Sequence, residues 1–158
     1  MDQNLKSYLD EQGIKYETYE HPAVFTVSES DKVTKHIPGN RSKNLFLKDE
    51  KGRFYLVSLP GEKRLDMKYL KRRLGVKELY FGSSEDLKRE LNLTPGSVSI
   101  FGMIYARNTS LLIDREIWEA EFSGFHPNIN TSTLVISRES LRKFCMSLSS
   151  KWEVVDLA

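Results

Sequence analysis

The chain has 158 residues, of which 39% are apolar and 29% are charged, with a net charge of +2. This length suits one globular domain, and the composition excludes a disordered chain. No apolar run approaches the roughly 18 residues that a membrane-spanning helix needs, so no membrane partner is expected. The first residues lack the features of a signal peptide and Cys145 is the only cysteine, so we expect a cytoplasmic protein without an internal disulfide.

Hydrophobic periodicity assigns most of the first half of the chain to regular elements. Leu5 and Leu9 share one face of a helix that Gly13 can end. Residues 21–26 are expected to be extended, because Pro22 disfavours a helix before it. We therefore expect helices at residues 2–12, 27–36 and 64–75, and strands at residues 14–20, 43–49 and 53–60.

The second half of the chain shows the same two kinds of pattern. Leu141, Phe144 and Leu148 are spaced as on the apolar face of a helix. Ser83 and Asp86 form a start close to a capping box. We expect helices at residues 83–92 and 138–149, a turn at 93–97, and strands at 78–82, 97–105, 110–114, 116–122, 131–137 and 151–157.

The clearest predicted feature is a hairpin, in which residues 43–49 and 53–60 are joined around Gly52. Both faces of these strands carry large apolar side chains, so the strands should be central and covered on both sides. The order of helices and strands along the chain is mixed. We therefore expect one α/β domain over residues 1–158, with a curved mixed sheet and helices packed around it.

The common catalytic motifs are absent from the sequence. There is no Cys-x-x-Cys pair, nucleophile elbow, Walker loop or dinucleotide-binding glycine motif, and the three histidines lack metal-ligand spacing. Cys145 falls on the apolar face of the last predicted helix, where a small core residue is expected. We expect neither a metal nor a cofactor.

Three polar stretches could form a site at the ends of strands, at residues 39–44, 93–98 and 123–131. Each also has a purely structural explanation. Lys43 could be a solvated strand end whose stem lies along apolar surface, or a cation held at a pocket. His126 could donate to a backbone carbonyl, and Gly96, Asn128 and Asn130 could serve only in turns.

One segment is strongly basic. Residues 62–73 contain six Lys or Arg side chains against two acids, a local net charge of +4. The segment is either a solvated helix face or a surface that contacts the phosphates of a nucleic acid.

Five segments of the chain, in order, resemble the freestanding prolyl-tRNA synthetase editing-domain family, the YbaK/ProX group. The resemblance covers nearly the whole chain, and its segments are specific together although each alone is weak. Within the family the sequence looks most like the branch that deacylates alanyl-tRNA(Pro), including the clostridial PrdX type. The segments are HPAVFTV (21–27), KNLFLKD (43–49), LPGEKRLD (59–66), LTPGSVS (93–99) and FHPNINTSTLVI (125–136).

The resemblance implies a curved, mostly antiparallel, barrel-like mixed sheet and a trans-editing activity. Prolyl-tRNA synthetase cannot strongly exclude the smaller alanine, because lost methylenes cost only about 1–3 kcal/mol of discrimination. The expected reaction is hydrolysis of the ester in Ala-tRNA(Pro). The expected partners are mischarged tRNA(Pro) and, as a second candidate, prolyl-tRNA synthetase, with no DNA partner. The alternatives are a deacylase for Cys- or Ser-charged tRNA and a non-catalytic module that binds tRNA or the synthetase.

The resemblance also implies site residues. Lys43 matches the family's essential lysine, and we expect it to anchor the tRNA end, because its reference pKa of about 10.4 makes it a poor base. The free ribose hydroxyl of the substrate is expected to help place the water. Ile100 stands where relatives often have proline, so the resemblance does not determine the backbone geometry of the loop that begins at Gly96, which we call the glycine loop. The expected substrate-binding residues are Asn44, Gly96, Ser97, Gly102, Gly124, Phe125, His126, Asn130 and Thr131, and the expected tRNA-binding residues are Lys63, Arg64, Lys68, Lys71 and Arg72.

Overall fold

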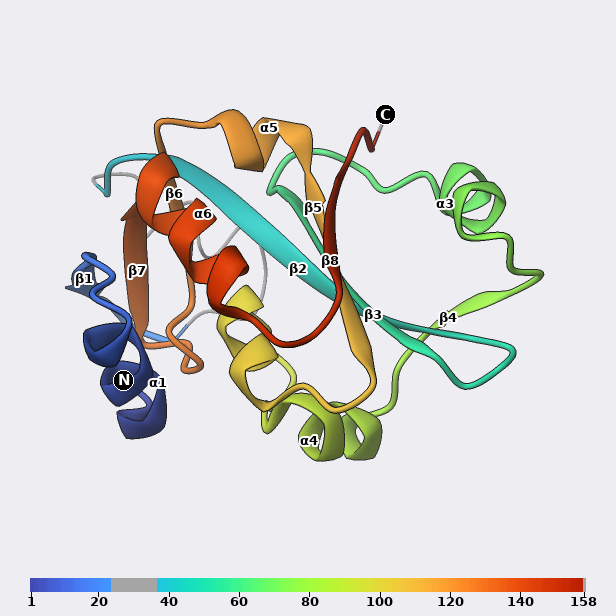
Figure 1. The fold of residues 1–158 in the computed structure, drawn as a ribbon, viewed down its shortest axis with the longest axis horizontal. Helices are drawn as coiled ribbons and strands as arrows, with labels where there is room; N and C mark the ends of the chain where they lie inside the picture. Colours follow the sequence, from blue (N-terminus) through green and yellow to red (C-terminus); the bar gives the residue numbers. More distant parts are fainter. Residues whose placement is uncertain (24–36, 158) are drawn as a thin grey trace.

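The computed structural model describes residues 1–23 and 37–157 of the chain, which form a mixed sheet flanked by helices (Figure 1). The helix expected at residues 27–36 lies outside the described residues. The helices are α1 Gln3–Glu11, α3 Met67–Leu74, α4 Ser84–Leu91, α5 Arg115–Glu119 and α6 Arg138–Ser147, with a 3-10 helix, η1, at Ile100–Tyr105. The strands are β1 Glu17–Glu20, β2 Asn40–Asp49, β3 Phe54–Pro60, β4 Leu79–Phe81, β5 Thr109–Asp114, β6 Phe122–Phe125, β7 Ser132–Ser137 and β8 Trp152–Val155.

The sheet has eight strands in the order β1-β7-β6-β2-β3-β5-β8, and β4 pairs with β2 beside this path. Within the described part of the chain, four of the seven strand pairings are antiparallel and three are parallel. Strand β2 is the junction, because it pairs with β6 at its start, with β4 at its end and with β3 along most of its length. The expected mixed sheet with surrounding helices is therefore confirmed.

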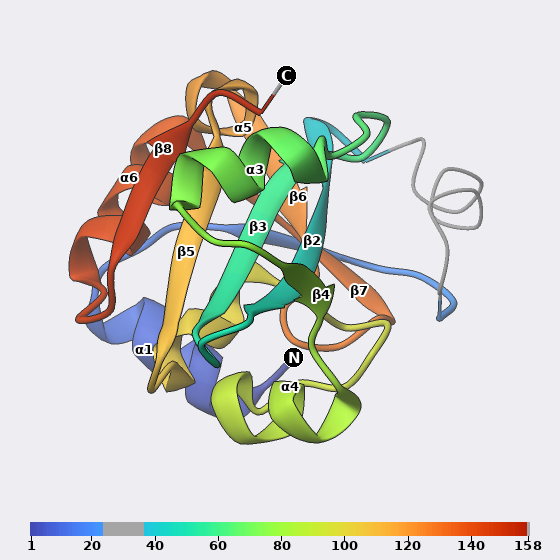
Figure 2. The same ribbon diagram turned by 90° about the vertical axis from the view of Figure 1, so that its right-hand side faces the viewer.

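The hairpin prediction is confirmed, and both of its faces are covered. Every residue of β3 is buried. Leu56 belongs to a large cluster that includes Leu5 of α1, Leu91 of α4 and Phe144 of α6. Val57, on the opposite face of the same strand, belongs to a second cluster under α3. We call these the inner face and the outer face of the sheet; Figure 2 shows α3 lying over β3 on the outer face.

The helix boundaries follow the expected capping chemistry. The Ser83 hydroxyl accepts a hydrogen bond from the Asp86 backbone N–H at 3.0 Å, which caps α4. Helix α3 ends at Gly75, whose φ of 68° is the left-handed conformation that glycine adopts without steric cost. Cys145 is fully buried, and burial raises the pKa of its thiol to about 12, so it is the inert core residue that was expected.

Two predicted strands are wrong. Residues expected as a strand at 97–105 instead form η1, in which Ile100, Phe101 and Met103 are all buried in the inner cluster. A segment buried on several sides shows no clean period, so its type cannot be read from the pattern. Residues expected as a strand at 116–122 form α5, followed by β6, which the pattern missed.

No helix among the described residues is long and apolar enough to cross a membrane.

Candidate functional site

The strand register brings part of the predicted site together on the outer face. Arg41 of β2 pairs with Gly124 of β6, and Gly124 pairs with Val135 of β7. Paired residues share a face of a sheet, and residues two apart in a strand also share it. Lys43 and Thr133 therefore lie on the same face as Gly124, although they are far apart in sequence.

Lys43 is half-buried at the edge of the apolar cluster of the outer face. Its Cα partner across the hairpin is Leu59, and Leu45 follows it on the same face, with both leucines in the cluster under α3. Its amine forms no hydrogen bond or ion pair with the residues that the structure describes. Its stem thus lies along apolar surface, and its charge is available to a ligand.

Asn44 and Ser42 point to the other face. The Ser42 hydroxyl donates a hydrogen bond to the Gly124 carbonyl at 2.7 Å, and the Asn44 side-chain amide donates to the Ser42 oxygen at 3.4 Å. Asn44 pairs with Ser58 of β3, which is completely buried. Through these hydrogen bonds, Ser42 connects β2 to the backbone of β6, and Asn44 supports Ser42. Asn44 lies on the opposite face of the sheet from Lys43.

A histidine that was not predicted as a site residue lies beside Gly124. The ring of His21 contacts the Pro22 carbonyl through Nδ1 and the Thr133 hydroxyl through Nε2, each at 2.8 Å. A carbonyl only accepts, so Nδ1 donates to the Pro22 carbonyl, and in the neutral ring Nε2 then accepts from the Thr133 hydroxyl. The signal for His21 was its place at the start of the first segment that resembles the family.

The Thr133 side chain occupies the space that a side chain at Gly124 would need. A Cβ atom added to Gly124 would lie 3.1 Å from the Thr133 methyl carbon. Gly124 is therefore a position where β6 and β7 approach closely, and the side chains next to this predicted substrate-binding residue are those of Thr133 and its partner His21.

His126 follows β6 and is half-buried. Its Nδ1 lies 3.4 Å from the Ser132 carbonyl, which is the backbone contact considered from the sequence. Burial lowers the pKa of His126, the nearby His21 lowers it further, and the Ser132 carbonyl opposes the shift. His126 is therefore neutral at pH 7, with Nε2 able to accept a hydrogen bond.

The neighbours of His126 differ in position. Phe125 is buried in the inner cluster, where its ring meets Phe101 edge-on at 5.6 Å, so it is a core residue. Thr131 is exposed, and its carbonyl accepts a hydrogen bond from the His21 backbone N–H at 3.0 Å. Asn130 is half-buried in the same loop.

Internal hydrogen bonds and close packing hold the glycine loop and the start of η1 in place. Gly96 has a φ of 89°, and the Ser97 N–H donates to the Thr94 carbonyl at 3.1 Å. The Gly102 N–H donates to the Ser99 carbonyl, and a Cβ atom at Gly102 would lie 2.6 Å from a Leu93 methyl carbon. The backbone N–H groups of Ser97 and Gly102 thus donate hydrogen bonds within the protein.

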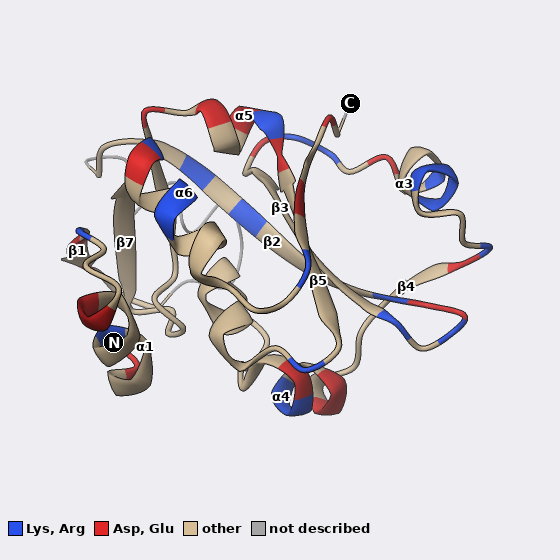
Figure 3. Ribbon diagram, viewed as in Figure 1, with Lys and Arg blue, Asp and Glu red and all other residues tan. Residues whose placement is uncertain are grey.

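The predicted basic surface lies on α3 and the turn before it, where Figure 3 shows Lys and Arg in blue. Helix α3 packs on the outer face, which also carries Lys43. Lys63 differs from the rest, because its amine pairs with Asp114 at 2.8 Å and with Glu116 at 3.0 Å. Its charge is neutralised within the protein. The others present their charges to solvent or lie half-buried on the helix: Arg64, Lys68, Lys71 and Arg72.

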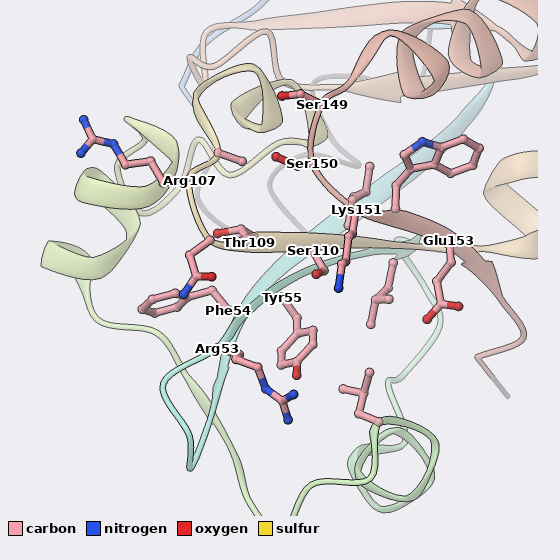
Figure 4. A pocket seen from close by; sticks show the side chains of 16 residues that line it. Arg53, Phe54, Tyr55, Arg107, Thr109, Ser110, Ser149, Ser150, Lys151 and Glu153 are labelled. Atoms are coloured by element: carbon pink, nitrogen blue, oxygen red, sulfur yellow. The ribbon is translucent and has the colours of Figure 1, made fainter.

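Two cavities lie away from the predicted residues. One, of about 960 Å³, is bounded by Arg53, Arg107, Lys151 and strand β5, and its side chains are shown in Figure 4. The other, of about 650 Å³, is lined partly by Tyr16 and Phe122. Neither includes Lys43 or His126. In the described ranges, no group of three His, Cys, Asp or Glu side chains is placed to hold a metal ion.

Comparisons with known proteins identify the family and the fold of the chain. A model of the aminoacyl-tRNA editing domain family matches residues 21–144. The chain is 34% identical over 152 residues to the prolyl-tRNA editing protein ProX of Acetoanaerobium sticklandii, covering 94% of this chain and 93% of that one. It is 32% identical to the prolyl-tRNA synthetase associated domain-containing protein 1 of Danio rerio, covering 89% and 78%. A solved structure described as a candidate trans-editing enzyme for prolyl tRNA synthetase superposes with a TM-score of 0.76 at 19% identity, covering 98% and 94%, and so shares the fold.

Proposed function

Because the chain belongs to the aminoacyl-tRNA editing domain family, we propose that it is an aminoacyl-tRNA deacylase acting in trans on Ala-tRNA(Pro). One observation supports this most directly. A half-buried lysine without a partner among the described residues shares one face of the sheet with Gly124, Thr133 and a basic helix. That surface combines a single placed cation with a wider region suited to phosphates.

In the reaction, water attacks the ester carbonyl, and the ribose oxygen of the terminal adenosine leaves with a proton. Lys43 holds the terminal phosphate or ribose and so fixes the ester in position, which lowers the entropic part of the barrier. A cation beside the ester also stabilises negative charge as it develops. The free ribose hydroxyl of the substrate assists the water.

The histidines suit a supporting role. Neutral His126 adds no second positive charge beside Lys43 and can accept a hydrogen bond from the α-ammonium group or from water. His21, held by Thr133, borders the space where the amino-acid side chain would lie. We place alanine before cysteine and serine because the sequence looks most like the alanyl-tRNA(Pro) branch and because side chains of this size beside the ester favour a small amino acid.

The test is a panel of tRNA(Pro) samples charged with alanine, cysteine, serine or proline. Wild-type protein should hydrolyse the alanyl ester fastest and leave the prolyl ester intact, and Lys43→Ala should lose at least about 100-fold in kcat/KM. Lys51→Ala, which removes a lysine from the β2–β3 turn, is the matched control and should behave as wild type.

Each alternative has its own outcome in the panel. Faster hydrolysis of the cysteinyl or seryl ester would reassign the substrate. Binding of tRNA without turnover at substoichiometric protein would show a binding module. A Lys43→Ala variant with wild-type rates would remove Lys43 from the site.

A further inference from the structure

Strand β4 exposes an aromatic ring on the face of the sheet that carries Lys43. Phe81 is 68% exposed, an unusual state for so large an apolar side chain. It pairs with Leu47 of β2, and Leu79, two residues before it, packs in the apolar cluster of the outer face. Phe81 therefore projects from the outer face, as Lys43 does.

The backbone under Phe81 is held at both ends. Before the strand, the Glu50 carboxylate accepts hydrogen bonds from the N–H groups of Lys77 and Glu78 at 3.0 and 3.1 Å. After the strand, the Gly82 N–H donates to the Phe46 carbonyl at 2.9 Å. A Cβ atom at Gly82 would lie 2.3 Å from the Phe46 ring, so the chain is pressed against β2 here. The exposed ring thus stands on a fixed support.

A basic helix lies next to β4 in the chain and packs in the same apolar cluster. Helix α3 immediately precedes β4 in the chain, and Leu70 of α3 packs in the same cluster as Leu79. The helix carries three basic residues in its last turn, of which Arg73 pairs with Glu153 at 3.4 Å, while Lys71 and Arg72 form no ion pair among the described residues. Along β2, Leu47 lies four residues from Lys43, a separation of about 13 Å at the usual strand rise. Exposed aromatic rings beside cations are the typical surface for single-stranded nucleic acid, because bases stack on the ring while cations follow the backbone.

We propose that Phe81 is a stacking platform for an unpaired base of the tRNA 3′ end, upstream of the terminal adenosine held at Lys43. This inference rests on the proposed function, since it takes the ester to lie at Lys43. The platform aligns the single-stranded end between the basic helix and the reacting group. A rigid ring costs little entropy to use, so its contribution should appear directly in affinity.

The test measures binding of uncharged tRNA(Pro) to wild type, Phe81→Ala and Phe81→Trp. Phe81→Ala should weaken binding by roughly tenfold, because removing a stacked ring typically has this effect. Phe81→Trp should bind as tightly as wild type. The salt dependence of binding should keep its slope in Phe81→Ala, because no phosphate contact is lost. A tRNA that lacks the single-stranded 3′ end should not distinguish the three proteins.

Tyr80 offers a matched control within the same strand. It is 47% exposed and pairs with Lys48, so it projects from the opposite face. Tyr80→Ala should bind intact tRNA as wild type does. Equal losses in Tyr80→Ala and Phe81→Ala, or no loss in Phe81→Ala, would overturn the proposal.

Two further measurements separate this proposal from its rivals. If β4 instead pairs with a second copy of the chain, Phe81→Ala will change the oligomeric state in light scattering and leave tRNA binding unchanged, which would overturn the platform. Hydrolysis of a minimal alanyl ester of adenosine should be the same in wild type and Phe81→Ala. If wild type does not hydrolyse that ester or Ala-tRNA(Pro), the proposed function fails, whereas the tRNA binding comparison still decides whether Phe81 stacks on the 3′ end.

Discussion

The two faces of the sheet are built differently. The inner face is covered by α1, α4, α6 and η1, and its cluster is continuous from Leu5 to Phe144. The outer face is covered by α3 over parts of β2, β3, β5 and β8, and the apolar cluster ends beyond Leu59, where Lys43, Thr133 and His21 lie. The cluster on the inner face contains more buried apolar residues than the cluster on the outer face. The outer face is only partly covered, and polar groups there are accessible. Stability and activity should therefore respond to substitutions on different faces.

The largest effect is expected on the inner face. Phe144 is completely buried and its ring meets Phe101 at 5.0 Å. Phe144→Ala should lower the free energy of unfolding by about 3–5 kcal/mol, because it leaves a cavity that the surroundings fill only in part. Urea denaturation measures this loss. A cost below about 1 kcal/mol would mean that the inner face is not the main source of stability.

Lys43→Met should show the opposite behaviour. Methionine keeps the length of the apolar stem and removes the charge, so the free energy of unfolding should change by less than about 0.5 kcal/mol. Hydrolysis of Ala-tRNA(Pro) should nevertheless fall at least about 100-fold in kcat/KM. The pair of measurements tests whether Lys43 is a solvated strand end or a functional cation, since a merely structural lysine would affect neither.

The contact between Thr133 and His21 should have a smaller effect. Thr133→Val removes the hydroxyl that donates to His21 Nε2 and keeps the shape of the side chain. We expect a roughly tenfold lower kcat/KM and a loss of about 1 kcal/mol in stability, as for one hydrogen bond. Thr133→Ser keeps the hydroxyl and should restore most of the activity. If the serine variant is as impaired as the valine variant, the methyl group against Gly124 matters more than the hydrogen bond.

The pH dependence of stability should show the smallest effect. Burial lowers the pKa of His126 in the folded chain, so below the reference value of about 6.5 the unfolded chain binds a proton that the folded chain resists. The free energy of unfolding should then fall as the pH drops below about 6.5, by at most about 1.4 kcal/mol per pH unit, and level off below the folded pKa. Comparing wild type with His126→Asn by urea denaturation between pH 7.5 and 5 isolates the contribution of His126. If the free energy of unfolding depends on pH in the same way in the two proteins, His126 has the same pKa in the folded and the unfolded chain.

The sequence predicted part of the proposed site and missed another part. It predicted Lys43 from its place at the start of the central strand and from the resemblance to the editing-domain family. His21 was not, because its partner Thr133 is 112 residues away and no local pattern reports that contact. Gly102 and Phe125 were assigned to the site, yet they lie in tight packing and in the inner core, which spacing alone cannot distinguish from a pocket.

Local chemistry in the sequence determined the β2–β3 hairpin, the caps of α3 and α4 and the amphipathic α6, because turn residues, capping side chains and hydrophobic period act over a few residues. Tertiary structure alone decided the parallel pairing of β2 with β6, the helical form of η1 and the face on which each polar group lies. These depend on contacts between distant segments, and a shift of one residue in register would move every side chain of a strand to the other face. That register is the reason Lys43 and Phe81 share one surface while Asn44 lies behind it.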